Sequence, residues 1–395
     1  MTTQQIMEST DQHIMHTYGR LPVAFVRGEG CRLWDADGNE WLDFVGGLAV
    51  CSQGHCHPKV VAAIREQAGL LIHTSNLYHI GPQAELAAKL CAISFADKCF
   101  FCNSGAEANE AAIKLARKYA KLNVDPGKYE VITARGSFHG RTLTTITATG
   151  QEKYQKHFDP LVPGFKYVDL NDLDGLRAAI GPQTAAVMLE PIQGEIGVKL
   201  CTREYLQGVR ALCDEQGMLL IFDEVQCGLA RTGKWFAYEH FGVEPDIMTL
   251  AKALGGGVPI GACLATDRVA SAFEPGDHAS TFGGNFLACA AALAALEAIE
   301  EDQLVERAAE MGEHMTGRLT ELQGGKPVVG EVRGRGLMLA IELREPRARE
   351  VQQRLFGQHI LVNAIGETIV RFVPPLVVTR EECDRVVVAV GEALD

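Results

Sequence analysis

The sequence has no apolar run long enough to cross a membrane. A spanning helix needs about 20 consecutive apolar residues, and no stretch of the 395 residues approaches that length. Residues 1–19 are polar, without the cationic start and apolar core of a secretory signal peptide. We therefore expect a protein of the cytoplasm.

Positive charge is scarce as well. The chain has 37 Lys and Arg against 50 Asp and Glu, which gives a formal net charge of −13. Nonspecific binding to nucleic acid or to an anionic membrane would work against the field of the whole protein. Neither class of partner is expected, although clustered arginines can still bind a small anionic substrate.

The sequence also lacks a disulfide framework and a spaced set of metal ligands. Its twelve cysteines follow no regular spacing, which favours buried reduced thiols. Cys99 and Cys102 form a CxxC, but they lie in an apolar, strand-like run instead of opening a helix, so a redox role is not favoured. His55-Cys56-His57 has no second pair at zinc spacing, and we expect a turn there and no metal.

What is there is an alternation of strands and helices through the middle of the chain. The apolar runs that predict strands are 129–134, 165–168, 185–190, 218–222, 246–250 and 260–265. Strands that alternate with helices predict an α/β fold with a mixed, mostly parallel sheet. Shorter antiparallel strands are expected over 23–44, after a polar lead-in, and helices and strands without strict alternation follow Glu301.

Residues 218–257 bring together the side chains best suited to chemistry. The apolar run 218–222 ends in Asp223 and Glu224, which places both carboxylates at the C-terminal end of a buried strand. Ligands of open α/β sheets bind at that edge. A second short strand leads to Lys252 in the sequence AKALGGG, where an isolated lysine among small residues is expected to lie in a crowded pocket.

A desolvated lysine near a buried aspartate favours one cofactor. Burial lowers the pKa of an amine, as Schiff-base formation near neutral pH requires. Pyridoxal phosphate uses such an amine, together with a carboxylate that keeps its ring nitrogen protonated. On spacing alone, a structural ion pair between Asp223 and Lys252 explains the pattern equally well.

Ser104 and Glu107 match a capping box at the start of an alanine-rich helix. Small residues in the first turn let a ligand approach the free backbone amides, and a phosphate would fit there. The pattern by itself is weak evidence for a phosphate site, since most capping boxes only stabilise the start of a helix.

Motifs along nearly the whole chain resemble the class III pyridoxal-phosphate aminotransferases. They are DEVQ at 223–226, AKALGGG, GHCHP, NSGAEANEAAIKLAR, SFHGRT, EPIQGE, STFGGN and RFVPPL. The match is strongest to the acetylornithine and succinylornithine aminotransferase branch. The resemblance implies fold type I: an N-terminal segment over 1–55 that joins the small domain, a large cofactor domain over 56–304, and a small α+β domain over 305–395.

The resemblance also assigns roles around the cofactor. Lys252 would carry pyridoxal 5'-phosphate and Asp223 would face its ring nitrogen. Contacts with the cofactor are implied for Ser104, Gly105, Ala106, Phe138, Asp223, Glu224, Val225, Gln226, Lys252 and Thr281. In relatives the threonine serves the neighbouring subunit, so we expect a homodimer with shared sites.

On the substrate side, the resemblance points to Arg141, Ser280, Arg371, Glu195 and Leu48. Arg141 would pair with a carboxylate distant from the reacting carbon, for which the guanidinium fork is suited. Glu195 is expected to cover Arg371 while the amino donor is bound and to swing away for the α-carboxylate of 2-oxoglutarate. Leu48 replaces a tyrosine that recognises free ornithine in relatives, which favours an N-acylated donor.

These assignments predict an enzyme that moves the terminal amino group of N2-acetyl-L-ornithine to 2-oxoglutarate in arginine biosynthesis. Succinylornithine, ornithine, 4-aminobutyrate and lysine stay open as alternative donors. An aminomutase or decarboxylase that uses the same cofactor is a further alternative, and a non-catalytic α/β binding protein is another.

Overall fold

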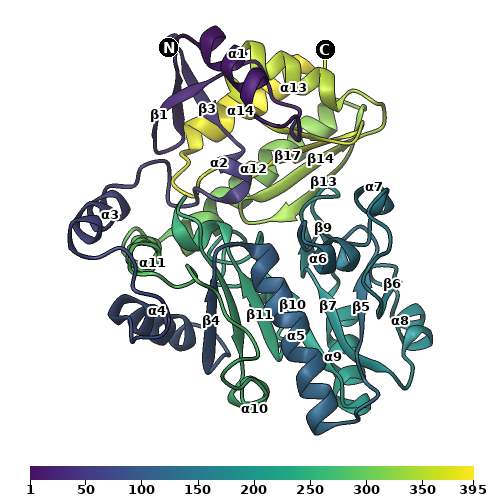
Figure 1. The fold of residues 1–395 in the computed structure, drawn as a ribbon. Helices are drawn as coiled ribbons and strands as arrows, with labels where there is room; N and C mark the ends of the chain where they lie inside the picture. The colour runs from purple at the N-terminus through teal and green to yellow at the C-terminus, as the bar shows by residue number, and fades with distance from the viewer.

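The computed structural model describes all of residues 1–395. A large sheet with its helices forms the lower part of the molecule in Figure 1, and two smaller sheets lie above it with both ends of the chain. None of the helices has the length and apolar character that a membrane span requires.

The large sheet has seven strands and positions the site. From one edge to the other they are β4 (Lys98–Cys102), β12 (Gly261–Ala265), β11 (Ile247–Leu250), β10 (Leu219–Asp223), β7 (Thr184–Leu189), β5 (Glu130–Ala134) and β6 (Phe165–Val168). Strands β11, β10, β7, β5 and β6 are parallel, whereas β12 is antiparallel to both of its neighbours. The predicted mixed, mostly parallel sheet is confirmed.

Helices cover both faces of this sheet because successive strand residues point to opposite sides. Along β10, Leu219 and Ile221 belong to the core cluster under α5 (Gly105–Asn123), whereas Leu220 and Phe222 pack in the cluster that includes α9 (Arg203–Gln216). The buried face of α5 is mostly alanine, which lets the helix lie close to the strands. Shorter helices in this part of the chain are α6 (Leu143–Ala148), α7 (Glu152–Gln155), α8 (Leu173–Ala179) and α10 (Asp267–Ala270).

Three helices, α3 (Pro58–Leu70), α4 (Gly81–Ala92) and α11 (Phe286–Glu301), pack together beside the edge strand β4. Alanine-rich α11 lies between the other two and contacts each of them. Further along the chain, the short 3₁₀ helix η1 (Ala237–His240) follows β10, and η2 (Lys252–Gly255) follows β11.

The C-terminal part is built on an antiparallel sheet. Its order is β13 (Val329–Arg335), β14 (Met338–Leu343), β17 (Ile369–Phe372) and β16 (Asn363–Ile365). The helices around it are α12 (Leu304–Gly325), α13 (Ala348–Gly357) and α14 (Arg380–Ala393). The sequence predicted most of these elements, but it did not predict β13.

The N-terminal strands join this C-terminal part. The strands β1 (Phe25–Glu29), β2 (Arg32–Asp35) and β3 (Glu40–Asp43) are antiparallel to one another, as expected, and β3 pairs in parallel with β15 (Ile360–Leu361). The first residues, expected only as a polar lead-in, form helix α1 (Thr3–His13), which a capping box between Thr2 and Gln5 begins. In Figure 1 the purple N-terminal strands lie next to the yellow C-terminal helix.

Candidate active site

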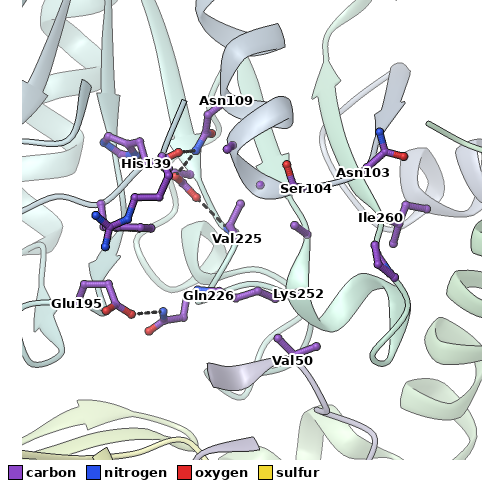
Figure 2. A pocket seen from close by; sticks show the side chains of 18 of the residues that line it. Val50, Asn103, Ser104, Asn109, His139, Glu195, Val225, Gln226, Lys252 and Ile260 are labelled. Atoms are coloured by element: carbon purple, nitrogen blue, oxygen red, sulfur yellow. Dashed lines mark hydrogen bonds and ion pairs between the residues drawn. The ribbon is translucent and has the colours of Figure 1, made fainter. Parts of the chain in front are cut away.

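A cavity of about 390 Å³ opens where the parallel strands end. Among its lining residues are Ser104, Gly105, Ala106, Phe138, Arg141, Glu195, Asp223, Val225, Gln226 and Lys252. These residues come from separate segments of the chain, and the sheet brings their strand and helix ends to one edge, as the sequence predicted. Figure 2 shows Glu195, Gln226 and Lys252 in a row along this cavity.

Asp223 is the last residue of β10, lies opposite Thr249 of β11 and is almost fully buried. One carboxylate oxygen, Oδ2, accepts hydrogen bonds from Asn109 Nδ2 at 2.7 Å and from His139 Nδ1 at 2.8 Å. The other, Oδ1, accepts from the Val225 amide at 3.0 Å. Three donors therefore fix the carboxylate in one orientation facing the cavity.

Asn109 and His139 were not predicted from the sequence. Both are buried, and the side-chain carbonyl oxygen of Asn109 in turn accepts a hydrogen bond from Thr249 at 2.7 Å. The available signal was an asparagine among alanines on the buried face of α5. A polar side chain in such a place needs partners, and here the partner is Asp223.

Lys252 lines the same cavity, but it is not the ion-pair partner of Asp223. The Asp223 carboxylate contacts His139 instead, so the structural ion pair between Asp223 and Lys252 that the sequence allowed is absent. Burial lowers the pKa of the Lys252 amine, Glu195 opposes this shift and Arg371 reinforces it. The result is a desolvated amine that loses its proton more readily than a surface lysine.

The first turn of α5 forms the opposite wall of the cavity. Ser104 Oγ caps the helix by accepting from the Glu107 amide at 3.2 Å, but the Glu107 carboxylate accepts from the Asn103 amide instead of returning to Ser104. The predicted capping box is therefore only half formed. A Cβ at Gly105 would lie 2.9 Å from Val225 Cγ1, so a larger residue would not fit between the two segments.

Buried Arg371 and partly exposed Glu195 form an ion pair at the far side of the cavity. Arg371 Nη1 lies 2.9 Å from Glu195 Oε1, and Gln226 Nε2 donates to the same oxygen at 3.0 Å. Burial alone would raise the pKa of Glu195, but Arg371 and Lys252 outweigh it and lower that pKa to about 2. The glutamate is therefore ionised at any physiological pH.

Glu190 is a further buried carboxyl group on the cavity wall. It accepts hydrogen bonds from the amides of Phe138 at 2.8 Å and Gly194 at 3.4 Å. Burial, followed by the nearby charge of Asp223, raises its pKa well above the usual value. Through these two hydrogen bonds Glu190 connects the segment of Phe138 with the segment of Glu195.

Arg141 is exposed at the mouth of the cavity and has no carboxylate partner in the chain. Its guanidinium lies 4.1 Å from the ring centre of Tyr154 and 5.3 Å from that of Phe138. Tyr154 was not predicted, and its ring steadies the guanidinium through a cation–π contact. Arg141 is left free to pair with an anionic ligand.

Some of the predicted residues lie outside the cavity lining. The Glu224 carboxylate turns away and accepts from the amides of Ala237 and Tyr238, both at 2.7 Å, while burial raises its pKa to about 8. Ser280 and Thr281 belong to a turn at the surface. Leu48 is half exposed in the short turn α2 (Gly46–Ala49), and its neighbour Val50 lines the cavity instead.

The segment His55-Cys56-His57 is a turn, as predicted. His55 Nε2 lies 2.7 Å from Asp43 Oδ2, and His57 Nε2 lies 3.0 Å from Asp302 Oδ2. No cluster of three or more metal-ligating side chains occurs in the structure.

The sequence of the chain is similar to those of many known proteins. The family model for class-III aminotransferases matches residues 14–394. The acetylornithine aminotransferase of Gloeobacter violaceus is 55% identical over 385 residues, covering 97% of this chain and 95% of the relative. That of Caldanaerobacter subterraneus subsp. tengcongensis is 52% identical, covering 97% of each.

Solved structures agree with this similarity. The ornithine aminotransferase of Toxoplasma gondii superposes with a TM-score of 0.95 at 36% identity, covering 100% of this chain and 95% of its own. The acetylornithine aminotransferase of Elizabethkingia anophelis gives a TM-score of 0.89 at 34% identity, covering 100% and 99%.

Proposed function

The chain belongs to the class-III aminotransferases, and we propose that within this family it transfers the terminal amino group of N2-acetyl-L-ornithine to 2-oxoglutarate. The products are N-acetyl-L-glutamate 5-semialdehyde and L-glutamate, as in arginine biosynthesis. The names of the relatives at 49–55% identity support this donor. The observation that carries it in the structure is the Glu195–Arg371 pair beside the desolvated Lys252.

The cofactor of this family is pyridoxal 5'-phosphate, and the cavity suits it. The amides at the start of α5 and the small residues Gly105 and Ala106 provide a place for the phosphate. Asp223 provides a fixed carboxylate for a ring nitrogen, and Lys252 provides the amine. When bound, the protonated ring of the cofactor withdraws electrons from the reacting carbon of the substrate.

The residues of the chain supply proton transfer and orientation. Lys252, with its lowered pKa, would act as both general base and general acid: within each half-reaction it would take a proton from one carbon and deliver it to another, so that its own protonation state is restored. Asp223 keeps the ring nitrogen protonated, and Asn109 and His139 prevent its carboxylate from rotating away. Phe138 lines the cavity as an apolar face for the ring.

Glu195 and Arg371 let one site accept two unlike substrates. The reacting carbon of the donor bears no carboxylate, so an uncovered Arg371 would face it as an unpaired buried cation, which is unfavourable. Glu195 neutralises Arg371 in that half-reaction. When 2-oxoglutarate binds, its α-carboxylate replaces Glu195 on Arg371, while Arg141 holds the distal carboxylate of either substrate.

A panel of amino donors tests this proposal. Initial rates with 2-oxoglutarate should be highest for N-acetylornithine or N-succinylornithine, and much lower for ornithine and lysine, because Leu48 offers no hydrogen bond to a free α-ammonium group. 4-Aminobutyrate has no such group, so its rate tests the one alternative donor that Leu48 does not disfavour. Free ornithine as the best donor would contradict the assignment of Leu48. An aminomutase or decarboxylase has less need of a carboxylate that covers Arg371, and 2-oxoglutarate-independent turnover would favour one.

We propose further that the enzyme is a homodimer in which Thr281 contacts the cofactor of the partner. Thr281 is exposed and outside its own cavity, on a turn beside an apolar surface. We also propose a cytoplasmic location, since all twelve cysteines are free thiols, which suits a reducing compartment.

Three structural units are proposed for the chain. A large cofactor domain over 56–304 contains the seven-stranded sheet, and a small domain over 305–395 contains the antiparallel sheet. Residues 1–55 belong with the small domain, and the pairing of β3 with β15 supports this division.

A further inference from the structure

The loop that carries Glu195 is tightly enclosed. It runs from β8 (Ile192–Gln193) to β9 (Lys199–Leu200), a two-stranded hairpin at the edge of the cavity. A Cβ at Gly194 would lie 1.8 Å from Gln226 Oε1, and a Cβ at Gly197 would lie 2.5 Å from Ile369 Cδ1. Each of these glycines therefore lies directly against a neighbouring side chain, which a larger residue would have to displace.

Two arginines of the C-terminal sheet hold this loop, one at each side of Glu195. Arg371 on β17 donates from Nη1 to the carbonyl oxygen of Gly194 at 2.9 Å. Arg333 on β13 donates from Nε to the carbonyl oxygen of Gly197 at 2.7 Å. Strand β9, where the loop ends, packs next to β13 (Figure 1).

The position of Arg333 is itself well determined. Its side chain is 9% exposed, and Nη1 lies 2.5 Å from both Glu331 and Glu342. These carboxylates neutralise the guanidinium, so it does not depend on the loop for its counter-charge. A hydrogen bond from a charged donor to a carbonyl is stronger than one between neutral groups, and here it is directed at a glycine two positions after Glu195.

Glu190 adds a third attachment on the cavity side. It accepts the Gly194 amide, so Gly194 is held through both its N–H and its C=O. With Gly197 held by Arg333, the backbone on both sides of Glu195 is fixed. The part that can still move is the Glu195 side chain, whose carboxylate must leave Arg371 when 2-oxoglutarate binds.

We propose that Arg333 is a positioning residue for the exchange of substrates: by holding Gly197, it restricts the opening of the Glu195–Arg371 pair to a rotation of the Glu195 side chain. This inference rests on the proposed function, because it assumes that Glu195 covers Arg371 in the donor half-reaction. Without Arg333 the Gly197 carbonyl loses its side-chain donor, so the loop between β8 and β9 is held less firmly, and Glu195 covers Arg371 for a smaller fraction of the time. The donor half-reaction then slows, whereas the half-reaction with 2-oxoglutarate, which needs Arg371 uncovered, does not.

The test uses Arg333→Lys in the holoenzyme. Lysine keeps a positive charge for Glu331 and Glu342 but lacks the Nε–H that reaches Gly197. Arg335→Lys is the matched control, because Arg335 lies on the same strand and its bond to His240 is exposed. Single-turnover absorbance should give a ratio of donor to acceptor half-reaction rates that falls roughly tenfold in Arg333→Lys, about the effect of one charge-assisted hydrogen bond, and is unchanged in Arg335→Lys.

A double-mutant cycle with Glu195→Ala separates this inference from the proposed function. If Arg333 acts through Glu195, Arg333→Lys has no further effect on the ratio once Glu195 is absent. An equal effect in both backgrounds, or equal slowing of both half-reactions by Arg333→Lys, would overturn the role of Arg333. If Glu195→Ala itself slows both half-reactions alike, it is the proposed covering of Arg371 by Glu195 that fails.

Hydrogen exchange gives a readout that does not depend on turnover. Amides of the peptide 192–199 should exchange faster in Arg333→Lys than in the wild type or Arg335→Lys, because one attachment of the loop is lost. Arg333→Gln, which lacks the charge as well, should show the same faster exchange and the same lowered ratio. Unchanged exchange in both Arg333 variants would contradict the inference.

Discussion

Asp223 shows how much of the site depends on single side chains. Its two oxygens receive three hydrogen bonds, from Asn109, His139 and the Val225 amide, and none from the lysine that shares its cavity. The carboxylate therefore lines the cavity without an ion pair to Lys252, as its proposed contact with a ring nitrogen requires. Its geometry is set before any ligand arrives, which is the condition for strong electrostatic stabilisation.

Replacing Asp223 with asparagine should separate cofactor binding from catalysis. The asparagine side chain can still accept the Val225 amide, and the amides of Gly105 and Ala106 are untouched, so the cofactor should remain bound. A neutral amide does not keep the ring nitrogen protonated, and kcat should fall by at least about a hundredfold. Bound cofactor is measured by absorbance and kcat by glutamate production; turnover within a few fold of the wild type would remove Asp223 from this role.

The turn α2 is the least ordinary element of the fold. Gly46, Gly47, Leu48 and Ala49 all have positive φ, at 56°, 64°, 68° and 62°. Each non-glycine residue in this left-handed region costs about 1–2 kcal/mol. Asp43 offsets part of that cost by accepting the amides of Val45 at 2.8 Å and Gly46 at 3.0 Å. The orientation of Leu48, the residue that we connect with donor choice, thus depends on Asp43.

The contact between His55 and Asp43 makes this element sensitive to pH. Burial alone would lower the pKa of His55, but the hydrogen bond to Asp43 outweighs it and raises that pKa to about 10, from 6.5. The folded protein therefore keeps a proton that the unfolded chain releases above pH 6.5. The stability contributed by this proton is complete below pH 6.5 and is lost as the pH rises toward 10.

His55→Gln should remove that dependence, since glutamine can bond to Asp43 without titrating. Between pH 6.5 and about pH 8.5, where thiols of the unfolded chain begin to ionise, the wild type should lose roughly 2 kcal/mol of unfolding free energy more than the variant. Urea unfolding at three pH values and one fixed protein concentration measures the difference. Parallel pH profiles for the two proteins would contradict the prediction.

Elements with a strong local pattern could be predicted from the sequence. Strand β10 is an apolar run that stops at Asp223, α11 is a continuous alanine-rich segment and α12 is amphipathic, so these elements were placed correctly. Strand β13 was missed because it has two arginines and two glycines and little apolar character. The capping box of α1 was present in the sequence, but the segment is polar on most sides.

The contacts between residues of the site were harder to predict from the sequence than the residues that line it. Asn109 and His139 reach Asp223 across 114 and 84 positions of the chain, and Arg333 reaches Gly197 across 136. No local pattern encodes such a contact, because each depends on how the finished sheets are placed. The resemblance to a family predicted the site residues that lie in the sequence motifs. The hydrogen-bond partners of those residues became known only from the structure.

For the whole molecule, the distribution of exposed apolar side chains supports a dimer. Leu71, Ile72, Leu77 and Tyr78 are exposed, and so is Phe282, whose ring centre lies 5.3 Å from that of His73. Asn76 bonds to the carbonyls of Ser280 and Gly283, which brings this segment next to the turn of Thr281. An exposed apolar surface of this kind is typical of an interaction site.

Phe282→Asp should therefore weaken the dimer and the retention of cofactor together. A carboxylate in an apolar interface is unfavourable, and separation withdraws the partner's Thr281 from the site. Light scattering over a dilution series, with cofactor absorbance measured in parallel, checks both effects. Val388→Asp on α14, also exposed, is the control and should change neither. A wild-type chain that is monomeric and fully active would contradict the dimer.

The pairing of β3 with β15 has a consequence for how the protein is made. Leu42 lies opposite Ile360, so the strands synthesised first find their last neighbour only when the chain is nearly complete. At about 5–20 residues per second, this interval on the ribosome is roughly 15–60 seconds. During that time the three-stranded N-terminal sheet has an open edge, and open edges pair readily with other chains. The nascent protein is therefore open to aggregation through these N-terminal strands, and a chaperone that shields them until Leu361 has emerged should raise the yield of folded enzyme.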